Sequence, residues 1–198
     1  MEKDLISPSI EKFTKEAIFK ELSAGDPLWD VPHTTAVVHH LKQILKYSPG
    51  LEDVDSTVVI IAAYGHDWGY SKFYRPGQPL TKEEYMEAKK THAKMAYEKI
   101  NYLLKNDIYK TLNSVQKDRI LHLILVHDQL DILKDKDELV LMEADTLGSL
   151  DADFVTSTWT KEQTLKHLED VRKKRLTKFI TRQGINEFEE CFRKRMNA

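Results

Sequence analysis

The run Ile60-Ile61-Ala62-Ala63-Tyr64-Gly65-His66-Asp67-Trp68-Gly69 carries an apolar segment directly into a histidine–aspartate pair, and a glycine follows shortly after. Residues 58–63 are apolar on every side, which is typical of a helix buried in the middle of a bundle. A buried strand is the alternative, because residues 58–61 are all β-branched. We favour the helix because the flanking segments also have helical patterns, and Gly69 would allow a helix to end near the pair.

The adjacent His66 and Asp67 are unusual residues to place at the edge of a core. Imidazole nitrogen and carboxylate oxygen are both good ligands for borderline divalent metals. Further candidate ligands come before and after the pair, each on a different predicted helix: His33, His92, His127 and Asp145. Helix bundles commonly build metal sites from side chains that project inward from separate helices. This set therefore predicts a central metal site.

Ordinary structural histidines are the alternative interpretation, since the chain has eight histidines. A lone histidine on an apolar helix face is usually a core residue whose ring nitrogens find hydrogen-bond partners. We assign this structural role to the histidines for which no partner can be argued, which are His39, His40, His122 and His167. A second pair, His127-Asp128, lacks the following glycine, so we keep His127 as a single ligand and expect Asp128 to face solvent.

Helical signals cover most of the chain. Thr81 with Glu84 and Thr160 with Gln163 form capping-box patterns, and Ser7-Pro8 is a typical helix start. Helices are predicted over about residues 8–22, 33–47, 55–66, 81–103, 114–127, 139–150, 160–176 and 185–196, with a loop over residues 69–79. The sequence therefore predicts an all-α fold, a single-domain helical bundle that spans residues 1–198.

The composition is that of a globular protein. Of the 198 residues, 41% are apolar and 31% are charged, and the net charge of −2 provides no basic field for binding nucleic acids or membrane surfaces. Residues 58–64, the best apolar run, are far shorter than the ~20 residues of a membrane span, and residues 1–5 lack the apolar core of a signal peptide. Cys191 is the only cysteine, which excludes a disulfide within the chain. We expect a cytoplasmic protein and leave a homodimer open.

The ordered ligand candidates and their neighbours resemble the HD-domain superfamily of metal-dependent phosphohydrolases. The segments that carry the resemblance are Asp30-Val31-Pro32-His33-Thr34, Ala62 to Gly69, and Glu143-Ala144-Asp145-Thr146-Leu147. Thr91-His92-Ala93 and Val126-His127 are similar to the extra histidines of the two-metal members. The resemblance covers roughly residues 29–150, which we take as an HD-like core with C-terminal helices over residues 160–197 packed on it.

This resemblance implies that one or two divalent ions bind, from among Mn, Co, Ni, Mg, Zn and Fe. The implied ligands are His33, His66, Asp67 and Asp145 for a first metal, and Asp67, His92 and His127 for a second, so that Asp67 would bridge the two. The implied reaction is hydrolysis of a nucleotide or another small phosphate ester by metal-activated water.

Asp67 is the central candidate catalytic residue. Lys72 and Arg75, in the predicted loop after the pair, are the candidate phosphate contacts, with a solvated polar loop as the alternative. The sequence departs from the family pattern at Tyr70, where many members have a lysine. Trp68 could stack on a nucleobase, but we expect it to pack in the core.

Two other functions stay open. Some HD-fold proteins hold two irons with the same ligand set and act as oxygenases, and these ligand types suit iron as well as manganese, cobalt or zinc. A non-catalytic regulatory HD module is the second alternative. A nucleic-acid interface would rest only on the basic run Arg172-Lys173-Lys174-Arg175, which we interpret as a solvated helix face. We therefore expect a small phosphorylated substrate. Residues 151–160 are the only weak boundary along the chain, and we expect no site residue after them.

Overall fold

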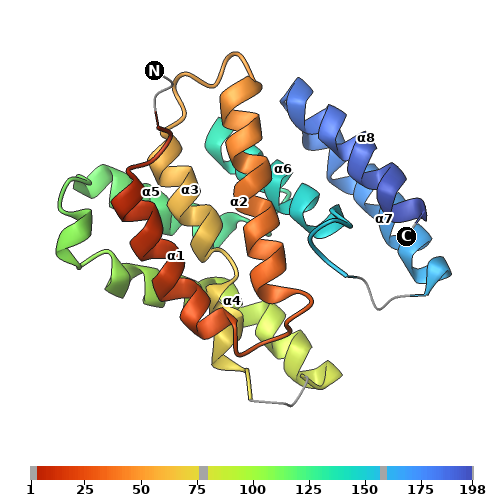
Figure 1. The fold of residues 1–198 in the computed structure, drawn as a ribbon, viewed down its shortest axis with the longest axis horizontal. Coiled ribbons are helices and arrows are strands. Elements are labelled where there is room, and N and C mark those ends of the chain that lie inside the picture. Colours follow the sequence, from red (N-terminus) through yellow and green to blue (C-terminus); the bar gives the residue numbers. More distant parts are fainter. Residues whose placement is uncertain (1–3, 76–79, 157–159, 198) are drawn as a thin grey trace.

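The computed structural model describes residues 4–75, 80–156 and 160–197, and its described residues form helices and turns without a β-strand (Figure 1). The elements in chain order are α1 (Pro8–Leu22), α2 (Asp30–Tyr47), α3 (Ser56–Gly65), η1 (Trp68–Lys72), α4 (Lys82–Leu103), η2 (Asp107–Tyr109), α5 (Ser114–Val126), α6 (Lys136–Leu150), α7 (Lys161–Lys174), η3 (Leu176–Lys178) and α8 (Arg182–Asn197). The all-α prediction is confirmed, and the β-branched run of residues 58–61 lies in a helix.

Several helix ends differ from the prediction. α2 begins at Asp30 and not at His33, because Pro32 fits the first helical turn, where its missing N–H is not needed. α6 begins three residues earlier than predicted, where the Glu138 carboxylate accepts the backbone N–H groups of Lys134 and Asp135. The predicted loop over residues 69–79 starts as the 3-10 helix η1, and residues 76–79 lie outside the described chain.

α3 is the central helix of the bundle and packs against α1, α2, α5 and α6. The Asp55 side chain caps its first turn by accepting the N–H groups of Thr57 and Val58. Every residue of α3 from Val58 to Gly65 is buried. Because α3 is buried on all its faces up to its last residue, the residues that follow Gly65 lie in the middle of the bundle.

The C-terminal helices attach to the bundle through α6. α7 and α8 lie side by side, and α8 also packs on α6 and α2 (Figure 1). The buried Glu143 carboxylate of α6 accepts the backbone N–H groups of Ile180 and Thr181, at 2.5 and 3.1 Å, and the Thr181 hydroxyl at 2.5 Å. Burial raises the pKa of Glu143 to about 7 despite these hydrogen bonds. Glu143, two positions before Asp145, therefore ties α6 to the start of α8.

No helix among the described residues is long and apolar enough to cross a membrane.

The close approach of η1 to α4 generates a prediction for Gly69. A Cβ atom at this position would lie 1.9 Å from the carbonyl oxygen of His92, which is backbone and cannot rotate away. We expect Gly69→Ala to lower the free energy of unfolding by about 2 kcal/mol or more, the cost of an overpacked core, as measured by urea denaturation.

Gly50→Ala provides the comparison. Gly50 has a φ of +88°, but no atom lies within 4 Å of the position that a Cβ would take there, so this change meets only the left-handed backbone penalty of about 1 kcal/mol. Equal stability of Gly69→Ala and the unmodified protein would show that η1 and α4 are not in tight contact.

Candidate metal centre

A first group of ligand atoms gathers His33 from the first turns of α2, His66 from the end of α3 and Asp145 from α6. The Nε2 atoms of His33 and His66 lie 3.3 Å apart. Asp145 Oδ1 lies 3.2 Å from Nε2 of His33 and 3.5 Å from Nε2 of His66. All three side chains are almost fully shielded from solvent. Three residues that are far apart in the sequence thus present one nitrogen or oxygen atom each to a common point.

A second group gathers His92 from α4 and His127 from the end of α5 beside Asp67. The two Nε2 atoms lie 3.2 Å apart, and Asp67 Oδ1 lies 3.5 Å from that of His92 and 3.6 Å from that of His127.

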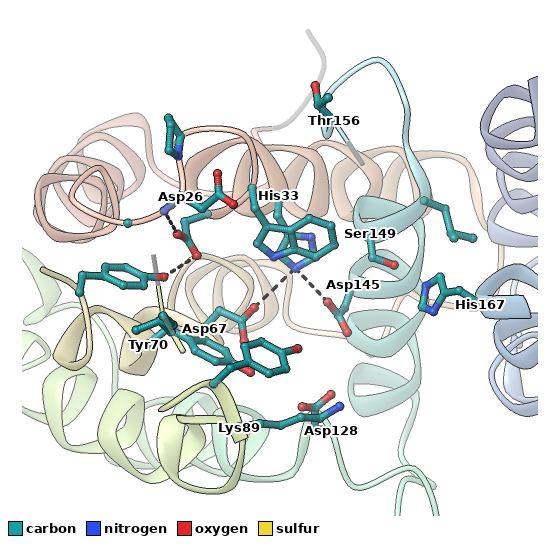
Figure 2. A pocket seen from close by; sticks show the side chains of 18 of the residues that line it. Asp26, His33, Asp67, Tyr70, Lys89, Asp128, Asp145, Ser149, Thr156 and His167 are labelled. Carbon is teal, nitrogen blue, oxygen red and sulfur yellow. Dashed lines mark hydrogen bonds and ion pairs between the residues drawn. The ribbon is translucent and has the colours of Figure 1, made fainter. Parts of the chain in front are cut away.

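Asp67 faces both groups at once. Its other oxygen, Oδ2, lies 3.6 Å from His33 Nε2 and 3.4 Å from His66 Nε2. Figure 2 shows the His33 ring with its contacts to Asp67 and to Asp145. One carboxylate therefore stands between two histidine pairs, each of its oxygens turned toward one pair.

Backbone hydrogen bonds orient three of the four imidazoles. Nδ1 of His66, His92 and His127 lies 2.8, 3.0 and 2.7 Å from the carbonyl oxygen three residues earlier in the chain. A ring that donates from Nδ1 keeps its lone pair on Nε2, which is the tautomer a metal ligand needs. His33 is held differently: the Trp29 ring stacks on it at 5.2 Å and 15°.

These distances fit a bound cation. With metal–nitrogen bonds of about 2.0–2.1 Å, neighbouring ligand atoms of a tetrahedral site are about 3.3–3.4 Å apart, close to the spacing found in both groups. Two imidazole lone pairs that face each other at 3.2–3.3 Å repel unless a proton or a metal ion lies between them. The set of imidazoles and carboxylates suits zinc, iron, manganese, cobalt or nickel.

The electrostatics of Asp67 and Asp145 also favour a bound cation. Burial would raise the pKa of the Asp67 carboxyl, but the neighbouring imidazoles of His66, His127 and His92 hold it well below its ordinary value. Burial likewise opposes ionisation of Asp145, whose pKa is nevertheless held well below normal by His33, His66 and Arg175. Two ionised carboxylates inside the bundle make this a favourable place for positive charge.

A cavity of about 880 Å³ opens onto both groups of ligands. Aromatic rings form part of its wall: Trp29 against His33, and Tyr70, which stacks on His92 at 4.5 Å and on Tyr85 at 6.3 Å. The basic side chains in the wall, apart from the ligand histidines, are Arg75, Lys89, His167, Arg175 and Arg195, and the wall also contains the acidic side chains of Asp26, Asp30 and Asp128. Figure 2 shows Lys89, Asp128 and His167 around this cavity. It has the size and mixed lining of a small-molecule site.

Arg175 is the main site residue that the sequence interpretation missed. At the end of α7, its guanidinium donates to Asp145 Oδ2 at 2.8 Å and to Asp128 Oδ1 at 3.2 Å, and its side chain is only 21% exposed. Burial opposes its charge, but Asp145 and Asp128 raise the pKa of Arg175 above its ordinary value. The prediction of a solvated basic run is therefore wrong for Arg175, which lies beyond residue 160 and contacts the candidate ligand Asp145. A signal existed, because Arg175 follows the buried Leu168 and Val171 at helical spacing.

The remaining predicted positions have different surroundings. Arg75 lines the cavity and forms an ion pair with Glu84, whereas the Lys72 side chain is exposed and is not part of the cavity wall. Asp128 is 35% exposed, but its Oδ2 also lies 3.7 Å from His92 Nε2, so it borders the second group as well as solvent. Trp68 is buried in the core, and the prediction that it packs there is confirmed.

Comparison with known proteins finds a family match over the segment that carries both ligand groups. Residues 31–150, more than half of the chain, match the family model of the HD domain, and this stretch contains both groups of ligand atoms. No curated protein and no solved structure gave a significant match. The chain therefore belongs to the HD-domain family.

Proposed function

We propose that this protein is a metal-dependent phosphohydrolase that acts on a nucleotide or another small phosphate ester. The HD domain is a fold of the metal-dependent hydrolase type, and the His and Asp groups of this chain could bind metal. The observation that carries the proposal is the Asp67 carboxylate between two histidine pairs, because a shared carboxylate allows two ions to act on one substrate.

The proposed ligands divide into two sets. A first ion would be held by His33, His66, Asp67 and Asp145, and a second by Asp67, His92 and His127. Asp128 adds a carboxylate at the edge of the second set. When bound, divalent ions supply Lewis acidity that activates water and neutralises charge on phosphoryl oxygens.

The protein's own cations would orient the phosphate. Arg175 is fixed by Asp145 and Asp128 at the side of the first set, with its planar guanidinium in the cavity wall. Guanidinium groups bind phosphate oxygens through paired hydrogen bonds, and Lys89 and Arg75 offer further positive charge to a polyphosphate. These basic side chains, in a wall that also carries Asp26, Asp30 and Asp128, support a phosphorylated substrate over the oxygenase alternative.

The aromatic wall would position the rest of the substrate. Trp29, Tyr70 and Tyr85 present ring faces on which a nucleobase could stack. A cavity of about 880 Å³ accepts a nucleotide-sized molecule, which is why we propose a small substrate and not a nucleic acid.

The shared carboxylate predicts an unequal effect of ligand substitutions on metal content. Asp67→Ala should lower binding of both ions, whereas His66→Ala should affect chiefly the first and His92→Ala chiefly the second. Metal titration by isothermal calorimetry, with elemental analysis of the protein, measures these stoichiometries. His39→Ala, a change of an exposed histidine outside both groups, should bind like the unmodified protein. Unchanged stoichiometry and affinity in Asp67→Ala would contradict the assignment.

Hydrolysis itself is tested with a panel of nucleotides and sugar phosphates, each assayed with manganese, cobalt, nickel, magnesium or zinc. We expect release of phosphate or pyrophosphate that is abolished in Asp67→Ala. No hydrolysis with any metal, together with two bound irons and O₂ uptake, would replace the proposal with the oxygenase function.

Arg175 provides a sharper test of phosphate binding. Arg175→Gln removes the charge that orders Asp145 and faces the cavity, so kcat/KM should fall by about 10- to 100-fold, the usual effect of losing a partner of a metal ligand. Lys173→Gln removes an exposed charge two residues away and should leave kcat/KM unchanged. Equal activity of the two variants would remove Arg175 from the proposed mechanism.

A further inference from the structure

A second cluster of potential ligands lies outside the cavity, where α2, the end of α6 and α8 meet. His40 of α2, Asp151 at the end of α6 and Cys191 of α8 are all buried, and one ligating atom from each lies within 4.8 Å of the other two. His40 is two helical turns beyond His33, or about 10 Å along α2. None of the three residues lines the cavity of the first centre. The cluster is therefore separate from it and combines nitrogen, oxygen and sulfur donors.

Hydrogen bonds hold these side chains in a ligand-like arrangement. His40 Nδ1 lies 2.5 Å from Oε2 of Glu187, a residue one turn before Cys191 on α8, and His40 Nε2 lies 3.0 Å from Asp151 Oδ2. A carboxylate on one ring nitrogen fixes the imidazole and leaves the other nitrogen to meet a metal. Asp151 is fixed in turn, because its Oδ1 accepts the backbone N–H of Asp153 at 2.8 Å.

A divalent ion can bind to this cluster without changing its net charge. Each ring nitrogen of His40 faces a carboxylate, Nδ1 that of Glu187 and Nε2 that of Asp151, so a doubly protonated ring bonds to both and balances one of the two negative charges. The buried Arg195, whose Nε donates to the Leu150 carbonyl at 3.0 Å, provides the second positive charge. An ion of charge +2 that replaces the His40 Nε2 proton and the Cys191 thiol proton leaves the total charge of the cluster unchanged.

We propose that His40, Asp151 and Cys191 bind one zinc ion, with Glu187 positioning His40 through Nδ1. Zinc is the divalent metal that most readily accepts nitrogen, oxygen and thiolate ligands together, and a water would take the fourth tetrahedral position beside these three protein ligands. The site joins three helices, so its role is structural: it fastens α8 to α2 and α6. α8 also carries Arg195 to the wall of the large cavity, so the zinc site would support that wall. The proposal stands independently of the phosphohydrolase function.

Cobalt substitution tests the site without interference from the first centre. Cys191 is the only cysteine of the chain, and the first centre contains only nitrogen and oxygen donors. Thiolate-to-cobalt charge-transfer absorption in the near ultraviolet therefore reports on this cluster alone. The full chain is stripped of metal with a chelator and titrated with Co²⁺. We expect the absorption to reach the amplitude of one thiolate-bound cobalt per chain, whatever amount of Co²⁺ the first centre takes up, and to disappear when Zn²⁺ is added.

Matched variants separate the two sites. Asp67→Ala should keep the charge-transfer absorption, and the nearly isosteric Cys191→Ser should lose it while retaining the helical circular dichroism of the unmodified protein. Glu187→Gln keeps all three ligands but weakens the support of His40, so cobalt affinity at this site should fall by about 10- to 100-fold.

Two results would overturn the proposal. Absence of the thiolate absorption at saturating Co²⁺, with equal zinc content in Cys191→Ser and the unmodified protein, would show that the cluster is only a buried ion network. Absorption that persists unchanged in both His40→Ala and Asp151→Asn would exclude His40 and Asp151 as ligands.

Discussion

The structure depends on one constraint, the enclosure of the Asp67 carboxylate, whose side chain is 20% exposed, among four imidazoles. An ionised carboxylate inside a protein is costly unless positive charge and hydrogen bonds compensate it. The four histidines come from α2, α4 and the ends of α3 and α5, so these helices must converge at one point for the charge to be tolerated. The contacts of Asp67 thus add a polar requirement to the packing of the apolar core, since four helices must meet around one carboxylate.

The bundle meets this constraint with unequal helices. α3 is short and buried on nearly every face, and it brings His66 and Asp67 to the centre at its end. α4 and α5 are longer and partly exposed. They supply His92 and His127, whose Nδ1 atoms bond to a backbone carbonyl one turn earlier in the same helix. These local hydrogen bonds fix the direction in which each ring presents its Nε2 atom, so part of the ligand geometry is set by the helices themselves. Such preorganisation reduces the cost of binding an ion.

The C-terminal helices contact the candidate site, although the family match ends at residue 150. On α6, Glu143 anchors the start of α8, while Asp145, two residues later, belongs to the first ligand group and accepts a hydrogen bond from Arg175 at the end of α7. One helix therefore couples the HD core to the segment that follows it. The His40 cluster makes a second connection to α8 on another side of the same junction. Both connections hold charged residues of the C-terminal segment against the cavity.

The sequence by itself determined the helical fold, the buried character of α3 and the six candidate ligands that the bundle brings together, because periodicity, capping patterns and ligand type are local properties. Only the tertiary structure decided which oxygen of Asp67 faces which histidine pair, since this depends on how helices distant in the sequence pack. Arg175 and His40 show the same limit. One was interpreted as part of a solvated face and the other as a histidine without a partner, yet their carboxylate partners lie 30 and 111 residues away, at Asp145 and Asp151. No local pattern encodes a contact over such a separation, and burial in the folded bundle is what gives it its strength.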